Sequence, residues 1–168
     1  DFGCGNGVTA NMLAAFGYEV SGIDISASGI AQARAAFPHV SFHVGSVYDD
    51  LLPVLGTLDV VISLEVIEHL YAPRDFIRTF DTLLRPSGTG LISTPYHGYF
   101  KNLAIALAGR FDAHFSPLWD GGHIKFWSIP SLRTLLLEQG FREPAFLRVG
   151  RVPPIAMSMV ALFEKPNP

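Results

Sequence analysis

Three glycines alternate near the start of the chain, in Asp1-Phe2-Gly3-Cys4-Gly5-Asn6-Gly7. Glycine lets a ligand approach the backbone closely, and the free amides at the start of a helix bind polar or anionic groups. A dinucleotide-binding turn has its third glycine where this chain has Val8, and Asp1 would repel a pyrophosphate. An acid at the head of the turn instead favours a ligand that carries a cationic amine.

A second acid ends the short strand expected over residues 19–24, Glu-Val-Ser-Gly-Ile-Asp. The carboxylate of Asp24 is well placed to accept hydrogen bonds from both hydroxyls of a ribose. An amine and a ribose without a diphosphate together describe S-adenosylmethionine. A nicotinamide cofactor is the less favoured alternative, because Val8 and Asp1 argue against it.

Two carboxylates and an imidazole follow the apolar run at residues 58–64. Glu65, Glu68 and His69 are spaced i, i+3 and i+4, so a helix beginning there would turn all three to one side. Carboxylate oxygens with one imidazole suit Mg²⁺, Mn²⁺ or a similar cation. The alternative is a solvated helix start without a metal.

Strands and helices alternate along most of the sequence, a pattern typical of a doubly wound, mostly parallel α/β sheet. We expect strands near residues 19–24, 40–44, 58–64, 89–93, 141–149 and 155–164, and helices near 8–16, 26–36, 73–84 and 128–139. The helix near 73–84 has one apolar stripe, formed by Phe76, Ile77, Phe80, Leu83 and Leu84. A turn at Pro86-Ser87-Gly88 should lead into the strand at 89–93. The last two strands should form an antiparallel hairpin at the sheet edge. A glycine turn normally follows a buried strand that is almost wholly missing here, so we expect an amino-terminally incomplete chain of low stability.

An aromatic segment, residues 96–127, holds 8 of the 20 aromatic residues and both tryptophans, Trp119 and Trp127. A long ordered connection of this kind is often a lid or a binding loop. We expect a helix at residues 100–108 to cover the reaction site with its apolar face. The alternative is an extra helix that only covers an apolar surface.

Composition excludes several classes of protein. Charged residues make up 16% of the chain, the formal net charge is −3 and there is no basic run, so nucleic-acid binding is not expected. Cys4 is the single cysteine, which excludes a disulfide framework. No apolar run reaches the roughly 18 residues of a membrane span. We expect one domain, residues 1–168, in the cytoplasm, with a small-molecule partner; the sequence gives no oligomeric state.

Several motifs resemble those of class I S-adenosylmethionine-dependent methyltransferases, above all their ubiquinone-biosynthesis O-methyltransferase branch. They are the glycine turn, Gly22-Ile23-Asp24-Ile25-Ser26, Glu65-Val66-Ile67-Glu68-His69-Leu70, Leu84-Arg85-Pro86-Ser87-Gly88 and Ser93-Thr94-Pro95. The resemblance implies a Rossmann-like sheet of order 3-2-1-4-5-7-6, in which strand 7 is antiparallel. Strand 1 would be largely missing here, and residues 96–127 would be inserted after strand 5.

The resemblance also implies a cofactor site. Around the methionine part it places Asp1, Gly3, Gly5, Gly7, Leu64 and Glu65. Around the ribose and adenine it places Asp24, Ile25, Ser46 and Val47. Ser46 stands where the family often has an acid for the adenine amine, and Val47 could offer a backbone N–H instead.

The resemblance also implies a site for the methyl acceptor, and this site depends on two histidines. Small-RNA 2′-O-methyltransferases look similar at residues 65–69 and bind a divalent metal through Glu-x-x-Glu-His and a distant histidine. By that resemblance, the candidate ligands for Mg²⁺ or Mn²⁺ are Glu65, Glu68, His69 and His123. Without a metal, His123 and His69 would position the acceptor or remove its proton. The implied reaction is methyl transfer to a hydroxyl of a small aromatic or polyol acceptor; a catalytically silent cofactor-binding remnant is the alternative.

Overall fold

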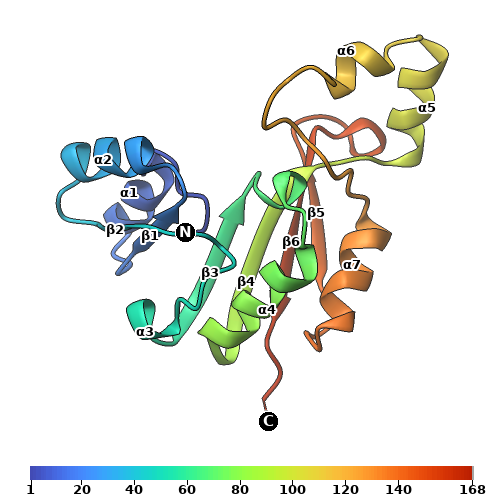
Figure 1. Cartoon of the computed structure of the whole chain (residues 1–168). Coiled ribbons are helices and arrows are strands. Elements are labelled where there is room, and N and C mark those ends of the chain that lie inside the picture. The colour runs from blue at the N-terminus through green and yellow to red at the C-terminus, as the bar shows by residue number, and fades with distance from the viewer. Residues whose placement is uncertain (168) are drawn as a thin grey trace.

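The computed structural model describes residues 1–167 and has an α/β fold with a mostly parallel sheet (Figure 1). Four strands pair in the order β3-β4-β6-β5, and two more pair as β1-β2. The strands are β1 (Ser21–Asp24), β2 (Ser41–Val44), β3 (Leu58–Leu64), β4 (Leu84–Pro95), β5 (Ala145–Val149) and β6 (Ser158–Glu164). The β1-β2 and β3-β4 pairs are parallel, whereas β6 is antiparallel to both β4 and β5. The last two strands thus form the expected hairpin, with β5 at the edge.

Helices connect most of the strands. They are α1 (Val8–Ala15), α2 (Ala27–Ala36), α3 (Leu52–Leu55), α4 (Pro73–Leu83), α5 (Tyr99–Leu107), α6 (Phe111–Phe115) and α7 (Ile129–Glu138), with short 3₁₀ turns η1 (Ile67–His69) and η2 (Pro153–Ile155). Ser26 and Ser128 cap α2 and α7 by accepting a hydrogen bond from an amide three residues later. Among residues 1–167, no helix combines the length and the apolar character needed to cross a membrane.

Phe2 joins the two groups of strands. It makes isolated parallel bridges to Ile23 in β1 and to Ser63 in β3, and its amide donates to the carbonyl of Ile62 at 2.8 Å. Its ring is 1% exposed and packs edge-on against Phe80 of α4, with 5.4 Å between the ring centroids. The residues just before the glycine turn therefore occupy a central position between β1 and β3.

The core on one side of the sheet is built by α4 and α7. The apolar stripe expected for α4 is buried, since Phe76, Ile77, Phe80 and Leu83 are each 0% exposed. Helix α7 adds Leu132 and Leu136 to the same cluster. This packing fixes the strands whose carboxyl ends carry the candidate site.

Two local expectations were wrong. The strand expected over 89–93 extends from Leu84 to Pro95, because the expected turn at Pro86–Gly88 is a bulge within β4 that pairs with Lys165. The helix expected to begin at Glu65 is only the 3₁₀ turn η1, because the backbone of Glu65 is left-handed, with φ 56°. A left-handed residue cannot continue an α-helix.

Candidate active site

The glycine turn requires glycine at each of its three alternating positions. Gly3, Gly5 and Gly7 have φ of 75°, 52° and 81°, a region that side chains disfavour. A Cβ atom on Gly3 would lie 2.4 Å from Val66 Cγ2, and one on Gly7 would lie 2.5 Å from the ring of Phe42. A Cβ atom on Gly5 would meet nothing within 4 Å, so there is open space for a ligand beside this residue.

Asp24 ties the turn to the end of β1. Its Oδ2 atom accepts the amide of Gly5 at 2.8 Å, and its Oδ1 atom accepts the amide of Ser26 at 2.8 Å. Each carboxylate oxygen keeps a further acceptor site. The half-buried carboxylate can therefore hold the turn and still accept ribose hydroxyls.

The other residues expected around the cofactor differ in exposure. Ile25 is 77% exposed directly after β1, as an apolar platform for a flat ring should be. Val47 is buried, and the amide of Ser46 donates to the carboxylate of Asp49 at 2.7 Å. The Oδ2 atom of Asp1 is buried and lacks a hydrogen-bond partner among the described residues. A buried carboxylate oxygen of this kind fits a cationic amine, the group expected of S-adenosylmethionine.

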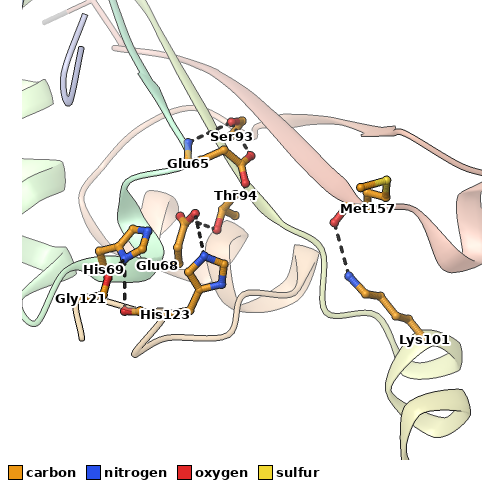
Figure 2. A network of polar contacts seen from close by, with 10 residues as sticks. Glu65, Glu68, His69, Ser93, Thr94, Lys101, Gly121, His123 and Met157 are labelled. Atoms are coloured by element: carbon orange, nitrogen blue, oxygen red, sulfur yellow. Dashed lines mark hydrogen bonds and ion pairs between the residues drawn. The ribbon is translucent and has the colours of Figure 1, made fainter. Parts of the chain in front are cut away.

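The end of β3 carries Leu64 and Glu65. The amide of Glu65 donates to the carbonyl of Ser93 at 3.1 Å, and its Oε1 atom accepts the Ser93 hydroxyl at 2.8 Å (Figure 2). Val66 follows directly and lies against Gly3. The backbone of residues 64–66 therefore borders the glycine turn.

Glu68, His69 and His123 form a cluster whose ligand atoms all lie within 4.8 Å of one another (Figure 2). The Nε2 atom of His123 is 3.9 Å from Oε1 of Glu68, and this oxygen is buried without a hydrogen-bond partner among the described residues. The other oxygen of Glu68 accepts the hydroxyl of Thr94 at 3.0 Å. Glu65, also expected in this group, is not part of it, because Ser93 holds its carboxylate elsewhere.

The loop at residues 121–125 is fixed by backbone contacts. His69 Nδ1 lies 2.8 Å from the carbonyl oxygen of Gly121, so Nδ1 carries the proton and donates it. The Nε2 atom of His69 is then left as an acceptor or a metal ligand. The amides of Ile124 and Lys125 donate to the carbonyl of Glu68 at 2.9 and 3.0 Å. These bonds bring His123 to η1, although the two are far apart in the sequence.

Burial changes the proton affinities in the cluster. It raises the pKa of Glu68, and the nearby carboxylate of Glu65 raises it further, while the Thr94 hydrogen bond opposes the shift. Desolvation, with the positive charge that His69 can carry, lowers the pKa of His123. His123 is therefore neutral at pH 7 and able to accept a proton or a metal ion.

A cleft of about 600 Å³ lies beside this cluster. Its wall includes Ile25 from the expected adenine side, His69 and His123 from the cluster, and Phe115 and Trp119 from the aromatic segment. Trp119 lies with its ring centroid 5.9 Å from that of His123. The cleft thus joins the expected cofactor side to the two histidines, and its size suits a small molecule.

The helix expected to cover the site lies elsewhere. Helix α5 spans nearly the expected residues, but none of them is buried, and it contacts η2 and α6 beyond the strand ends (Figure 1). Lys101 holds its first turn by donating to the carbonyl of Tyr96 at 2.8 Å. The residues of the aromatic segment that line the cleft come from positions 115–124 instead.

Hydroxyl and carbonyl groups to which the sequence analysis assigned no role support the site. Ser93 and Thr94 were noted only as part of the motif Ser93-Thr94-Pro95, but their hydroxyls hold the two glutamates. The carbonyls of Gly121 and Gly122 lie beside the ring of His69. His97 is 8% exposed and stacks on Phe115, with ring centroids 5.9 Å apart, so it is a packing residue behind the cleft wall.

Comparisons with known proteins point to methyltransferases. Residues 1–143 match a family described as a methyltransferase domain. A probable S-adenosylmethionine-dependent methyltransferase of Mycobacterium tuberculosis is 30% identical over 143 residues, 85% of this chain and 48% of that protein. A ubiquinone biosynthesis O-methyltransferase of Caulobacter vibrioides is 34% identical over 113 residues, 65% of this chain and 44% of that protein. The chain spans less than half the length of these two relatives.

The fold also occurs among solved structures. The crystal structure of an S-adenosylmethionine-dependent methyltransferase from Mesorhizobium loti superposes with a TM-score of 0.77. The two sequences are 18% identical, and the superposition covers 98% of this chain and 89% of that one. At this identity the likeness concerns the fold alone.

Proposed function

Because the chain belongs to the methyltransferase domain family, we propose that it transfers the methyl group of S-adenosylmethionine to a hydroxyl of a small, flat acceptor. The observation that carries this proposal is the cleft whose lining includes Ile25, next to Asp24, as well as His69 and His123. A hydroxyl acceptor is supported by the name of the Caulobacter relative. We include the cytoplasm in the proposal, a reducing compartment in which the buried thiol of Cys4 would stay free.

Two acids would hold the cofactor, one at its methionine part and one at its ribose. The unpartnered carboxylate oxygen of Asp1 would bind the amino group of the methionine part, next to Gly3, Gly5 and Gly7. Asp24 would accept the ribose hydroxyls, and Ile25 would pack on the adenine, with Ser46 and Val47 at its edge. Leu64 and Glu65 would close the methionine end from β3.

The acceptor would lie between Trp119 and the two histidines. An aromatic wall excludes water and favours a flat, largely apolar molecule. Lys and Arg are absent from the residues that line the cleft, whereas Asp120 and the nearby Glu68 are acids. A neutral acceptor such as a phenol therefore suits the cleft better than an anionic one.

The protein has to align the reactants and remove one proton. S-adenosylmethionine supplies a methyl group on a sulfonium, so no covalent intermediate on the protein is needed. His123 would accept the hydroxyl proton while the acceptor oxygen bonds to the methyl carbon, and the electron pair of the broken C–S bond remains on sulfur. Glu68, 3.9 Å away, would stabilise the imidazolium that forms, and His69 would hold the loop in place.

The alternative role of the cluster, in place of the general base, is to bind Mg²⁺ or Mn²⁺. The donor set suits Mn²⁺ better than Mg²⁺, because two imidazoles stand beside one buried carboxylate oxygen that has no partner among residues 1–167, all within 4.8 Å of one another. The ligands would be Glu68, His69 and His123, without Glu65. A cation there would lower the pKa of the attacking hydroxyl.

The proposal is tested with methyl-labelled S-adenosylmethionine and a panel of a phenol, a catechol, an aliphatic diol and an aromatic amine. Mass spectrometry should find one methyl ether formed per S-adenosylhomocysteine released, with a phenol or catechol as the preferred acceptor. His123→Ala should lower product formation by about 10²–10⁴-fold, whereas His39→Ala, at an exposed position outside the cleft lining, should not change it. Label on the amine alone would refute the hydroxyl acceptor, and the absence of product from every acceptor would count against the proposed reaction.

A further inference from the structure

Two neighbouring side chains at the end of β4 separate the two glutamates of the Glu-x-x-Glu spacing. The hydroxyl of Ser93 donates to Oε1 of Glu65 at 2.8 Å, and that of Thr94 donates to Oε2 of Glu68 at 3.0 Å (Figure 2). Successive side chains of a strand point to opposite faces. The two glutamates are therefore held apart, Glu68 in the histidine cluster and Glu65 outside it.

Glu65 has an unusual backbone for a residue with a side chain. Its φ of 56° lies in the left-handed region, where glycine is favoured. Strained residues of this kind persist only where their surroundings hold them, and they are frequent at ligand sites. The partner that holds Glu65 is Ser93, which contacts both its backbone and its side chain.

Ser93 makes a closed set of hydrogen bonds with Glu65. Its carbonyl and its hydroxyl oxygen both accept the Glu65 amide, at 3.1 and 3.2 Å, while the hydroxyl proton is donated to the Glu65 carboxylate. Ser93 is 7% exposed, so water cannot readily replace these bonds. The side chain thus fixes the backbone and the carboxylate of Glu65 together.

The fixed residue borders the glycine turn. Leu64 pairs with Ser93 in the sheet, and Ser63, one residue earlier, donates its hydroxyl to the carbonyl of Phe2 at 3.0 Å. On the other side of Glu65, Val66 lies in the space that a side chain on Gly3 would need. Any displacement of Glu65 would therefore shift the wall of the turn.

We propose that Ser93 is a positioning residue for the methionine end of the cofactor, acting by holding Glu65 in its left-handed conformation. This inference rests on the proposed function, since it assumes that Glu65 borders S-adenosylmethionine. Ser93 itself need not touch the cofactor. Thr94, one residue further on, serves the cluster of Glu68 and not the cofactor.

The test is a double-mutant cycle on S-adenosylhomocysteine affinity, measured by calorimetry on variants whose thermal unfolding shows that they are folded. Ser93→Ala should weaken binding by about fivefold or more, and Ser93→Thr, which keeps the hydroxyl, should stay within about twofold of the original affinity. Glu65→Gly removes both the strain and the carboxylate. In that background, Ser93→Ala should change the affinity by less than about twofold.

Thr94→Val is the matched control, because it removes a buried hydroxyl from the same strand end and should leave the affinity within about twofold. An unchanged affinity in Ser93→Ala, or an equal loss in both backgrounds, would overturn the positioning role. If Ser93→Ala does not fold, Ser93→Cys takes its place, since a thiol is only a weak hydrogen-bond donor. Absence of binding by the unaltered protein would instead refute the proposed function.

Discussion

The Oδ2 atom of Asp24 accepts a hydrogen bond of 2.8 Å from the amide of Gly5, so the end of β1 and the glycine turn are held together. The same carboxylate accepts the amide of Ser26 at the start of α2. One side chain therefore organises the turn, the strand end and a helix start. This explains how an acid at this position can shape the expected cofactor site even before a ligand is bound.

Asp24→Ala should weaken S-adenosylhomocysteine binding by at least about tenfold, because charge-assisted hydrogen bonds contribute roughly 1.5–3 kcal/mol each. Calorimetry on a folded variant measures this change. Asp59→Ala is the control, since Asp59 is an exposed acid at the other end of β3 that pairs with Arg85. Equal affinity of Asp24→Ala and the unaltered protein would remove Asp24 from the site.

The double substitution Trp119→Ala and Phe115→Ala should abolish most acceptor turnover, since both residues line the cleft. Affinity for S-adenosylhomocysteine should stay within about threefold, because both side chains lie on the side of the cleft proposed for the acceptor. Steady-state kinetics and calorimetry provide the two readings. Leu107→Ala should leave turnover unchanged, because Leu107 of α5 is 80% exposed and does not line the cleft. A loss of turnover in this control would restore α5 as the cover of the site.

His123→Ala should lower turnover by about 10²–10⁴-fold, the usual contribution of a general base, without altering S-adenosylhomocysteine affinity. Because the pKa of His123 is lowered, turnover should be retained at pH 7 and fall only in more acidic solution. The base role predicts that turnover survives dialysis against a chelator. Loss of turnover on chelation, with recovery on adding Mn²⁺, would assign the cluster to a cation.

The buried His97 should make the protein sensitive to acid. Burial is the main cause that lowers its pKa from 6.5 to about 4, and the positive charge of Lys101 adds to it. The unfolded chain then binds more protons than the folded one between these two values, so stability falls as the pH is lowered from about 6.5 to about 4. The shift corresponds to a loss of roughly 3 kcal/mol or slightly more in the free energy of unfolding.

His97→Phe should remove this part of the acid sensitivity while keeping the ring that stacks on Phe115. Urea unfolding at neutral and acidic pH gives the loss of stability for each protein. Other titrating groups contribute to both proteins, so the difference isolates His97. The same loss in both would show that His97 does not cause it.

The sequence was most informative where a position admits few residue types. Alternating glycines predicted a turn that only glycine allows to approach a ligand closely, and the structure shows positive φ at all three. The stripe of Phe76, Ile77 and Phe80 predicted the buried face of α4. Asp24, the acid that ends an apolar strand, was predicted to lie at the edge of the sheet that carries the glycine turn. The reason is that the carboxyl ends of parallel strands meet at one edge.

The features of the fold and of the site that the sequence did not predict depend on contacts between distant segments of the chain. The left-handed Glu65 and its bond to Ser93 arise from sheet pairing, so helical spacing alone placed Glu65 wrongly beside Glu68. The position of α5 could not be read from its apolar pattern, because that pattern does not say which surface it meets. His123 was correctly brought near Glu68, but the backbone bonds that hold it were not foreseen.

The most direct test of the central claim is a calorimetric titration of the protein with S-adenosylhomocysteine and, separately, with NAD. Three features predict one S-adenosylhomocysteine bound per chain and no heat from NAD: the open turn at Gly5, the ribose acceptor Asp24, and the Oδ2 atom of Asp1, which has no partner among residues 1–167. Asp24→Ala should weaken the S-adenosylhomocysteine signal in the same experiment. Binding of NAD, or absence of S-adenosylhomocysteine binding by the folded protein, would contradict the account.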